Sequence, residues 1–545
     1  MAASCSHGNR GCRSRTPPFV APVPKRWYVS GGMDEFFLGV DAGTESIRAG
    51  IYDSHGSCRG SAASANRTFF EHAGWAEQRP ADWRAALEES IRAALADAGI
   101  DGRQIAGVCV DGTTCTLVFL DGEQRPLRNA IMWMDVRAAD EAREASAIDH
   151  PARKYVGYGA VSAEWFPARA LWVKRHEPQL YERCALILEE TDWLTFLITG
   201  EVAANINTAS VRWFYDARDG DYPVDFYRLM GLDDVSSRLP RPVRAIGERA
   251  GTVQPEFASA TGLHAGTPVA VGGGDAWMAS IGVNAIHAGR VALSTGSSHA
   301  LVGFSPAELH ANGFFGSCPD GVVPGLHIIE GGQTSTGSVL HWFTENLVGA
   351  GIVESARTNG ESVYELLNRQ AADIPPGSEG LLVLEHWQGN RTPWVDPTSR
   401  GVIRGLTLRH TTAHIYRAIL EGVAYGTAVI FRTMRENGFT PAGITACGGA
   451  TRSDFWMQLH ADITGLPITI NREQQAACLG SAIAAAVAAG SYPDLRTAAA
   501  AMVHPQRTVE PRAAQTEKYL PYVDQFIETY WQLRELSRRL SSTSG

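Results

Sequence analysis

Three short segments of small residues, widely separated along the chain, carry groups suited to phosphoryl transfer. Asp41–Thr44 (DAGT) and Thr295–Ser298 (TGSS) each follow an apolar run, and Gly272–Asp275 (GGGD) places a carboxylate on a glycine-rich turn. Turns of small residues leave backbone N–H groups available to phosphate oxygens, and a glycine backbone lets a substrate approach closely. Two phosphate-binding turns and one carboxylate are the groups needed to move a phosphoryl group from ATP to a hydroxyl.

Asp275 is the predicted general base. A carboxylate beside a sugar hydroxyl can accept its proton as the new bond to phosphorus forms. Because a helical pattern begins directly after Asp275, the alternative is that this carboxylate caps the N-terminus of that helix.

Strand and helix patterns alternate along the chain in a way that would position these turns. Apolar runs predict strands at residues 36–41, 47–52, 61–66, 105–111, 267–274, 291–295, 299–303 and 444–449, with 117–121 as the hairpin partner of 105–111. Helical spacing predicts helices at 80–98, 163–176, 190–199, 411–435, 477–490 and 518–540. The strand–turn–strand design near residue 41 recurs near residue 295. This recurrence indicates two related domains that each bring one phosphate-binding hairpin to a shared cleft.

Composition narrows the class of protein. With 545 residues the chain is too long for a single core, and its net charge of −10 argues against nucleic acid or an anionic membrane as the main partner. The nine cysteines are scattered without a CxxC pair, which disfavours a zinc site or a redox dithiol and is typical of reduced thiols in the cytoplasm. The longest apolar stretches, such as 482–490, are too short to span a bilayer.

The N-terminal segment differs from the rest of the chain. Residues 1–32 contain five Arg and Lys residues, several Pro and Ser, and no acidic residue. We interpret 1–33 as a disordered extension or the product of a misplaced start codon, with Met33 as the functional start. We divide the remaining chain into an N-terminal domain at 34–285, a C-terminal domain at 286–505, and a helix and tail at 506–545.

One long motif, in the second half of the chain, connects these observations. Residues 401–406 (GVIRGL) are followed, after seven residues, by 414–421 (HIYRAILE). With the order and spacing of the three turns, this motif resembles the FGGY family of carbohydrate kinases over residues 36–505. The resemblance implies an α/β fold of two actin-like (ribonuclease H-like) ATPase domains flanking a catalytic cleft. Many FGGY kinases pair as dimers, so a homodimer is among the expected assemblies.

Several segments resemble ribulokinases and related pentulokinases within that family. They are 113–117 (TTCTL), 162–165 (SAEW), 330–333 (EGGQ), 387–391 (WQGNR) and 447–449 (CGG). Residues 131–137 (IMWMDVR) are more similar to D-ribulose and sugar-alcohol kinases. The chain departs from the family pattern at Arg169, where a Lys is usual, and at Trp277, where pentulokinases carry His or Asn. Trp277 leaves the identity of the sugar open.

The resemblance implies ATP and Mg²⁺ as cofactors. Asp41 would reach Mg²⁺ directly or through water, since hard oxygen ligands suit this ion. The glycine-rich turns would supply the remaining nucleotide contacts: Gly43, Thr44 and Ser46 at the γ-phosphate with Arg48 close by, Thr295, Gly296 and Ser297 at the other phosphates, and Gly337, Gly448, Gly449 and Ala450 at the adenosine. The alternatives are ordinary hairpin turns and close packing of strands on helices.

The resemblance to ribulokinases also implies the residues that meet the sugar. These are Thr114, Cys115, Arg212, Asp275 and Glu330. Polar groups matched to each hydroxyl would discriminate between sugars, because a missing partner leaves a buried group unpaired.

Structural roles, without contact to a ligand, remain open for several of these residues. Arg212 could equally be a surface residue, and Asp135 and Arg137 could form a structural ion pair. Three tryptophans are candidates for stacking on a sugar face, although core packing is the safer default for any one of them: Trp133, Trp165 and Trp277.

The expected activity is transfer of the γ-phosphoryl group of ATP to the terminal hydroxyl of a ribulose-type ketopentose in carbohydrate catabolism. A kinase of xylulose, or of a sugar alcohol such as erythritol, ribitol or xylitol, is the alternative enzyme. A non-catalytic sugar-binding regulator and a chaperone-like ATPase are further hypotheses. The intact Asp41, Asp275 and Thr295 argue against the regulator, and the FGGY motif argues against the chaperone. Phosphate sites divided between two domains imply a cleft that closes on the sugar and excludes water.

Overall fold

The first predicted hairpin lies in a six-stranded sheet, named here the N-terminal sheet. The computed structural model describes residues 35–543, so the extension expected at 1–33 lies outside the described residues. The strand order is β11-β12-β5-β1-β2-β3, and the bounds in that order are Arg249–Thr252, Pro268–Ala270, Ile105–Gly112, Phe36–Ala42, Ser46–Asp53 and Cys58–Ala65. β1 runs antiparallel to β2 and parallel to β5, which sets Asp41 opposite Asp111.

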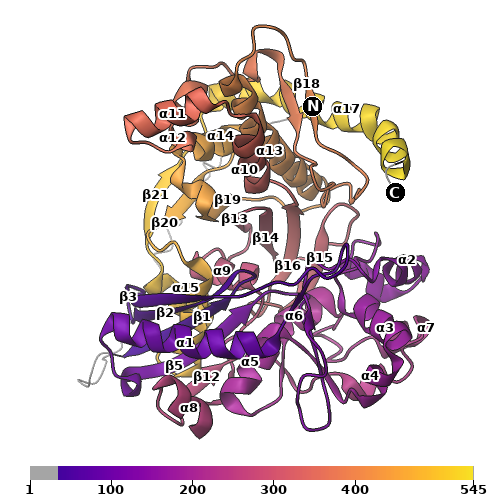
Figure 1. The fold of residues 1–545 in the computed structure, drawn as a ribbon, viewed down its shortest axis with the longest axis vertical. Coiled ribbons are helices and arrows are strands. Elements are labelled where there is room, and N and C mark those ends of the chain that lie inside the picture. The colour runs from indigo at the N-terminus through magenta and orange to yellow at the C-terminus, as the bar shows by residue number, and fades with distance from the viewer. Residues whose placement is uncertain (1–34, 544–545) are drawn as a thin grey trace, which may run out of the picture. The chain divides into compact units, whose positions relative to one another are not determined.

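The second predicted hairpin lies in a seven-stranded sheet, named here the C-terminal sheet. Its order is β15-β16-β14-β13-β19-β20-β21, with bounds Phe315–Pro319, His327–Gln333, His299–Ser305, Arg290–Thr295, Gly443–Gly448, Ile468–Asn471 and Pro505–Val509. β13 runs antiparallel to β14 and parallel to β19, the same local pattern as β1 with β2 and β5. The two sheets lie in the lower and upper halves of Figure 1, and the repeated hairpin design is confirmed.

The strand expected at 117–121 forms as β6 (Leu117–Leu120), but its predicted partner is wrong. β6 pairs with β7 (Ala130–Ile131) and β8 (Leu186–Glu189), and β4 (Glu77–Gln78) completes this small sheet. The physical reason is the position of β5, which lies between β12 and β1 and therefore has no free edge. The chain leaves the N-terminal sheet after β5 and uses β6 to begin a second layer.

Helices cover both faces of the N-terminal sheet, because successive strand side chains point to opposite faces. Leu38 and Val40 of β1 pack in one cluster with residues of α1 (Pro80–Ala98). Phe37 packs in the other cluster with residues of α9 (Asp275–Gly282) and α15 (Ala476–Ala488). Thus α15, which follows β20 of the C-terminal sheet in sequence, packs against β1 and β5 of the N-terminal sheet.

The remaining elements surround these layers. The helices are α2 (Ala139–Ala147), α3 (Phe166–His176), α4 (Pro178–Arg183), α5 (Glu190–Thr199), α6 (Ile206–Arg212), α7 (Val224–Leu229), α8 (Pro255–Thr261), α10 (Gly337–Leu347), α11 (Ala350–Asn359), α12 (Val363–Ala372), α13 (Thr412–Glu436), α14 (Asp454–Thr464), α16 (Leu495–Met502) and α17 (Ala513–Thr543). Two short strand pairs complete the fold: β9 (Ala204–Asn205) with β10 (Val243–Arg244), and β17 (Leu382–Leu384) with β18 (Val402–Arg404).

Small residues let α15 approach its neighbours at backbone distance. A Cβ atom on Gly480 would lie 1.9 Å from the carbonyl oxygen of Met278 in α9, and one on Gly282 of α9 would lie 1.8 Å from the carbonyl oxygen of Ala476. Both distances are far below van der Waals contact, so each helix needs a glycine where it meets the other. The small-residue helix expected at 477–490 is therefore confirmed as a close-packing element.

We expect Gly480→Ala to destabilise the protein, because one methyl group would force α15 away from α9. Overpacking of this kind costs about 1–3 kcal/mol, so the melting temperature in a thermal scan should fall. The matched control is Gly351→Ala in α11, where a Cβ would meet no atom within 4 Å and alanine is the better helix former. A Gly480→Ala protein that melts with the control would contradict this account of the interface.

Candidate active site

The β1–β2 hairpin holds the first set of predicted residues. Its turn is closed by the Gly43 N–H, which donates to the carbonyl oxygen of Ser46 over 3.1 Å. The Thr44 hydroxyl oxygen accepts a hydrogen bond from the indole N–H of Trp133 over 2.9 Å. The Gly296 N–H of the second hairpin likewise donates within its own turn, to Ser298 over 2.9 Å. Each glycine N–H thus already closes a turn, which leaves the hydroxyls of these turns as the better candidates for contact with phosphate.

Three carboxylates meet at the carboxyl ends of β1 and β5 and at the start of α9. Asp41 and Asp111 face each other across the parallel pair, and a bridge between Gly112 and Gly274 brings the start of α9 to the same edge. Asp275 is the first residue of α9 and Gly274 is its N-cap. The interpretation of Asp275 as the N-cap is therefore wrong, and its carboxylate accepts only the adjacent Ala276 N–H among the described hydrogen bonds.

Burial and mutual repulsion shift the proton affinities of these groups. Burial raises the pKa of the Asp275 carboxyl to about 7, and the charge of Asp41 adds to this rise. Burial also raises the pKa of Asp41, opposed by Arg48, whose guanidinium lies 3.6 Å away. A carboxyl whose pKa lies near neutrality is suited to general base catalysis.

Asp111 belongs to this cluster and was assigned no role from the sequence. Its side chain is fully buried, one carboxylate oxygen accepts the Ser481 hydroxyl over 2.6 Å, and burial together with Asp41 raises its pKa well above the ordinary value. The available signal was its place at the end of an apolar strand, the same place that Asp41 occupies. The register between β1 and β5, which sets Asp111 opposite Asp41, cannot be predicted from the residues of either strand alone.

The residues predicted to hold the nucleotide gather around the β13–β14 turn. The Thr295 hydroxyl donates to the Cys447 carbonyl over 2.7 Å and accepts the Ala450 N–H over 3.1 Å. The Gly337 N–H donates to the Gly296 carbonyl over 3.1 Å. Gly448 ends β19, next to β13, and Gly449 and Ala450 follow it. The Thr295 hydroxyl thus holds the β13–β14 turn against the turn that follows β19, in addition to any contact with phosphate.

The two glycines at the end of β19 differ in the space around them. A Cβ atom on Gly448 would lie 1.9 Å from the Thr295 carbonyl oxygen, whereas one on Gly449 would meet no atom within 4 Å. Gly448 is therefore required by packing. Gly449 is not, and its exposed backbone can accommodate a flat ligand.

Arg212 and Glu330 form a buried pair in the predicted sugar site. The Arg212 Nη2 atom lies 2.8 and 2.9 Å from the two carboxylate oxygens of Glu330, and Arg391 lies 3.3 Å from one of them. Burial alone would raise the pKa of Glu330, but the charges of Arg212 and Arg391 hold it below the ordinary value. The surface-residue interpretation of Arg212 is wrong, because only 2% of this residue is exposed.

Tryptophans and the loop after β5 surround this pair. The guanidinium of Arg212 lies 5.3 Å from the ring centroid of Trp165 and 5.1 Å from that of Trp277. Thr114 contacts the start of α9, since a Cβ atom on Gly274 would lie 2.4 Å from its methyl group. Cys115, the next residue, has a positive φ of 62°. The predicted sugar residues are therefore connected to Asp275 through Thr114 and Trp277.

Asp135 and Arg137 have a structural role. Their ion pair spans 2.7 Å and both side chains are buried. Asp135 also accepts the Ala76 N–H over 2.6 Å. The structural ion-pair alternative is thus confirmed for these two residues.

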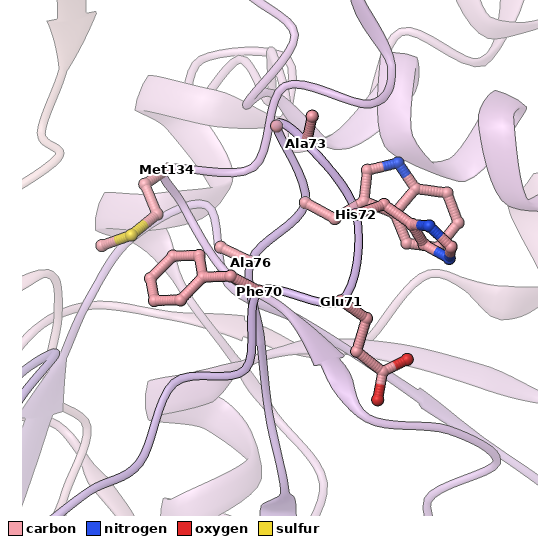
Figure 2. Close-up of a pocket in the computed structure, with 8 residues that line it drawn as sticks. Phe70, Glu71, His72, Ala73, Ala76 and Met134 are labelled. Atoms are coloured by element: carbon pink, nitrogen blue, oxygen red, sulfur yellow. The ribbon is translucent and has the colours of Figure 1, made fainter.

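Two surface pockets are lined by residues other than the predicted ones. One pocket of about 390 Å³ is formed by residues 70–76 and Met134 (Figure 2). Another of about 440 Å³ is lined by Thr451, Arg452, Asp454, Ile470, Gln474, Gln506 and Arg507. Within residues 35–543, no group of three or more His, Cys, Asp and Glu side chains could hold a metal by itself. Over the same residues, no helix combines the length and apolar character needed to cross a membrane.

Comparisons with known proteins agree with this arrangement. Residues 36–282 match the N-terminal domain of the FGGY family of carbohydrate kinases, and residues 291–489 match its C-terminal domain. The chain is 33% identical to a ribulokinase of Geobacillus thermodenitrificans over 493 residues, covering 84% of this chain and 86% of the relative. It is also 33% identical to a ribulokinase of Mycolicibacterium smegmatis over 506 residues, covering 86% and 89%.

A solved structure shows the same architecture. The xylulose kinase of Rhodospirillum rubrum superposes with a TM-score of 0.82 at 28% identity, covering 92% of this chain and 100% of that one. The α/β fold of two actin-like (ribonuclease H-like) domains is therefore confirmed, and the signature motif at 401–421 identified the right family. By these matches, the chain belongs to the FGGY family of carbohydrate kinases.

Proposed function

We propose that this carbohydrate kinase transfers the γ-phosphoryl group of ATP to the terminal hydroxyl of a ribulose-type ketopentose. The observation that carries the proposal is the Asp275 carboxylate, buried and with its pKa raised to about 7. It begins α9, where Gly274 contacts Thr114 and where Trp277 lies against Arg212 of the Arg212–Glu330 pair. The ribulokinase names of the relatives support the choice of sugar. The balanced charges of Arg212 and Arg391 with Glu330 and Glu164 favour a neutral substrate.

In this proposal Asp275 accepts the proton of the attacking hydroxyl. Glu330 and Arg212 orient the other hydroxyls, and their burial makes an unmatched hydroxyl costly. Thr44 and Ser46 contact the γ-phosphate, Thr295, Gly296 and Ser297 contact the other phosphates, and Gly337 with residues 448–450 borders the adenosine. Closure of the two domains would exclude water from the reacting groups.

Asp41 would hold Mg²⁺ together with phosphate oxygens of the nucleotide. The residues fit this ion, because Asp41 is a partly accessible carboxylate and Mg²⁺ sites in kinases use one or two carboxylates with substrate phosphates. The bound ion would neutralise charge on the transferring group.

A second candidate is phosphorylation of xylulose or a sugar alcohol. The observation in favour of a sugar alcohol is Trp277, which lies against Arg212 and changes the wall of the site relative to pentulokinases. A xylulose kinase also superposes over 92% of this chain.

An ADP-release assay with MgATP should separate these candidates. The panel is D- and L-ribulose, D- and L-xylulose, erythritol, ribitol, xylitol and glycerol. We expect one ribulose isomer to give the highest kcat/KM. A preference for xylulose or a polyol would instead support the second candidate, and tight sugar binding without turnover would support a non-catalytic regulator.

We expect Asp275→Asn to lower kcat by about 10²–10⁴-fold, because the amide cannot accept the proton. The protein should keep its melting temperature, since the side chain keeps its size. The matched control is Asp454→Asn at the first position of α14, which should leave turnover unchanged. Full turnover by Asp275→Asn would remove the base from this mechanism.

The pH dependence of kcat/KM for the sugar tests the same carboxyl. Asp275 must be ionised to act as a base, and its pKa is raised to about 7, so activity should rise with pH through neutrality. Below the pKa we expect a loss of about tenfold per pH unit. A profile that stays flat down to pH ~5, where an ordinary carboxyl is still ionised, would contradict the raised pKa.

A further inference from the structure

Arg169 is a buried cation that forms no ion pair with any residue between 35 and 543. It lies in α3 and is fully buried, and burial lowers its pKa. Its guanidinium donates instead to four backbone carbonyls, those of Cys115, Ile131, Trp133 and Asp135, the last three over 3.3, 2.9 and 3.0 Å. Burying a charge without a carboxylate partner is costly, so the carbonyls that it binds indicate what the arrangement serves.

Those carbonyls belong to two segments that lead to different parts of the site. Cys115 lies in the loop after β5, where Thr114 contacts the turn of Asp275. Trp133 lies in the segment after β7 and donates its indole N–H to the Thr44 hydroxyl over 2.9 Å. A single guanidinium therefore joins the loop at the predicted sugar site to the hairpin at the predicted phosphate site.

The bond from Trp133 also orients the Thr44 hydroxyl. A hydroxyl has one proton to donate and two lone pairs. Because Trp133 occupies a lone pair, the proton of Thr44 remains available for an acceptor such as a phosphate oxygen. Loss of the indole N–H would leave that hydroxyl free to rotate.

We propose that Arg169 is a positioning residue that sets the sugar loop through Cys115 and the phosphate-side hydroxyl of Thr44 through Trp133. This inference rests on the proposed function. Its physical basis is the planar guanidinium, whose five donors can satisfy several carbonyls at once, whereas a lysine ammonium is a point charge with three donors. Arginine here, where the family usually has lysine, is thus a specific property of this chain.

Two variants separate the two connections. Arg169→Lys keeps the charge but loses the fork, so we expect KM to rise about three- to tenfold for both the sugar and MgATP, the size expected for one lost hydrogen bond on each side. Trp133→Phe keeps an aromatic ring and removes only the N–H, so KM should rise by a similar factor for MgATP and stay unchanged for the sugar. Thr44→Val removes the hydroxyl itself and should raise the KM for MgATP at least as much as Trp133→Phe does. Adding Trp133→Phe to Thr44→Val should then have no further effect on MgATP.

The control is Trp193→Phe in α5, a buried tryptophan whose indole N–H has no partner among residues 35–543. It should change neither KM. Calorimetric titration of each variant with MgATP in the absence of sugar supplies a readout that does not depend on turnover. We expect weaker MgATP binding in Trp133→Phe and normal binding in Trp193→Phe.

Several results would overturn the proposal. An Arg169→Lys protein with a lower melting temperature and unchanged KM values would mean that Arg169 serves only stability. Should Arg169→Lys fail to fold, normal MgATP binding by Trp133→Phe would still contradict the connection to Thr44. If the unchanged protein phosphorylates no sugar, the proposed function fails, while the calorimetric comparison continues to test Trp133 and Thr44.

Discussion

Crowding of carboxylates at one edge of the N-terminal sheet is the constraint on which the site depends. Asp41, Asp111 and Asp275 come from three different elements. The charge of Asp41 raises the pKa of both other carboxyls, and the charge of Asp275 adds to the rise at Asp111. Charges that repel in a buried place need fixed partners nearby. Arg48, the Ser481 hydroxyl and the Ala276 N–H at the start of α9 fill that role. A helix N-terminus also favours an anion beside it, which helps to keep Asp275 ready to ionise.

The same constraint explains the composition of α15. Ser481 reaches Asp111 only because its helix lies directly on β1 and β5, where a Cβ on Gly39 would lie 1.9 Å from the Cys478 carbonyl oxygen. Larger residues along α15 would lift the helix away and leave Asp111 without its hydroxyl partner. The alanine-rich helix therefore supports the three carboxylates of the candidate site, although none of its residues is expected to contact a substrate. The hydrogen bond that Asp111 receives at the sheet edge thus depends on the close packing of α15 against β1 and β5.

Local signals in the sequence were sufficient for most of the fold. Glycine turns after apolar runs located both hairpins, and the long FGGY motif identified the family. Long-range pairings were less accessible. The partner of β6 was missed because the pattern of 117–121 does not reveal that both edges of β5 are occupied. Arg212 gave no local signal because its partner Glu330 lies 118 residues away in sequence. The use of the Gly43 and Gly296 N–H groups within their own turns depends on hairpin geometry that residue types alone do not specify.

The Arg212–Glu330 pair joins α6, in the N-terminal family domain, to β16, in the C-terminal one. Pulling such a pair apart would leave two buried charges unpaired, so the domains cannot simply separate along this line. Rotation about the pair would preserve it. The rotation axis would then pass through the predicted sugar site, and the parts of the two domains far from this site would move the most. With such an axis the sugar could stay bound while one nucleotide leaves and another binds. The order in which the two substrates bind would then be set by the position of the rotation axis.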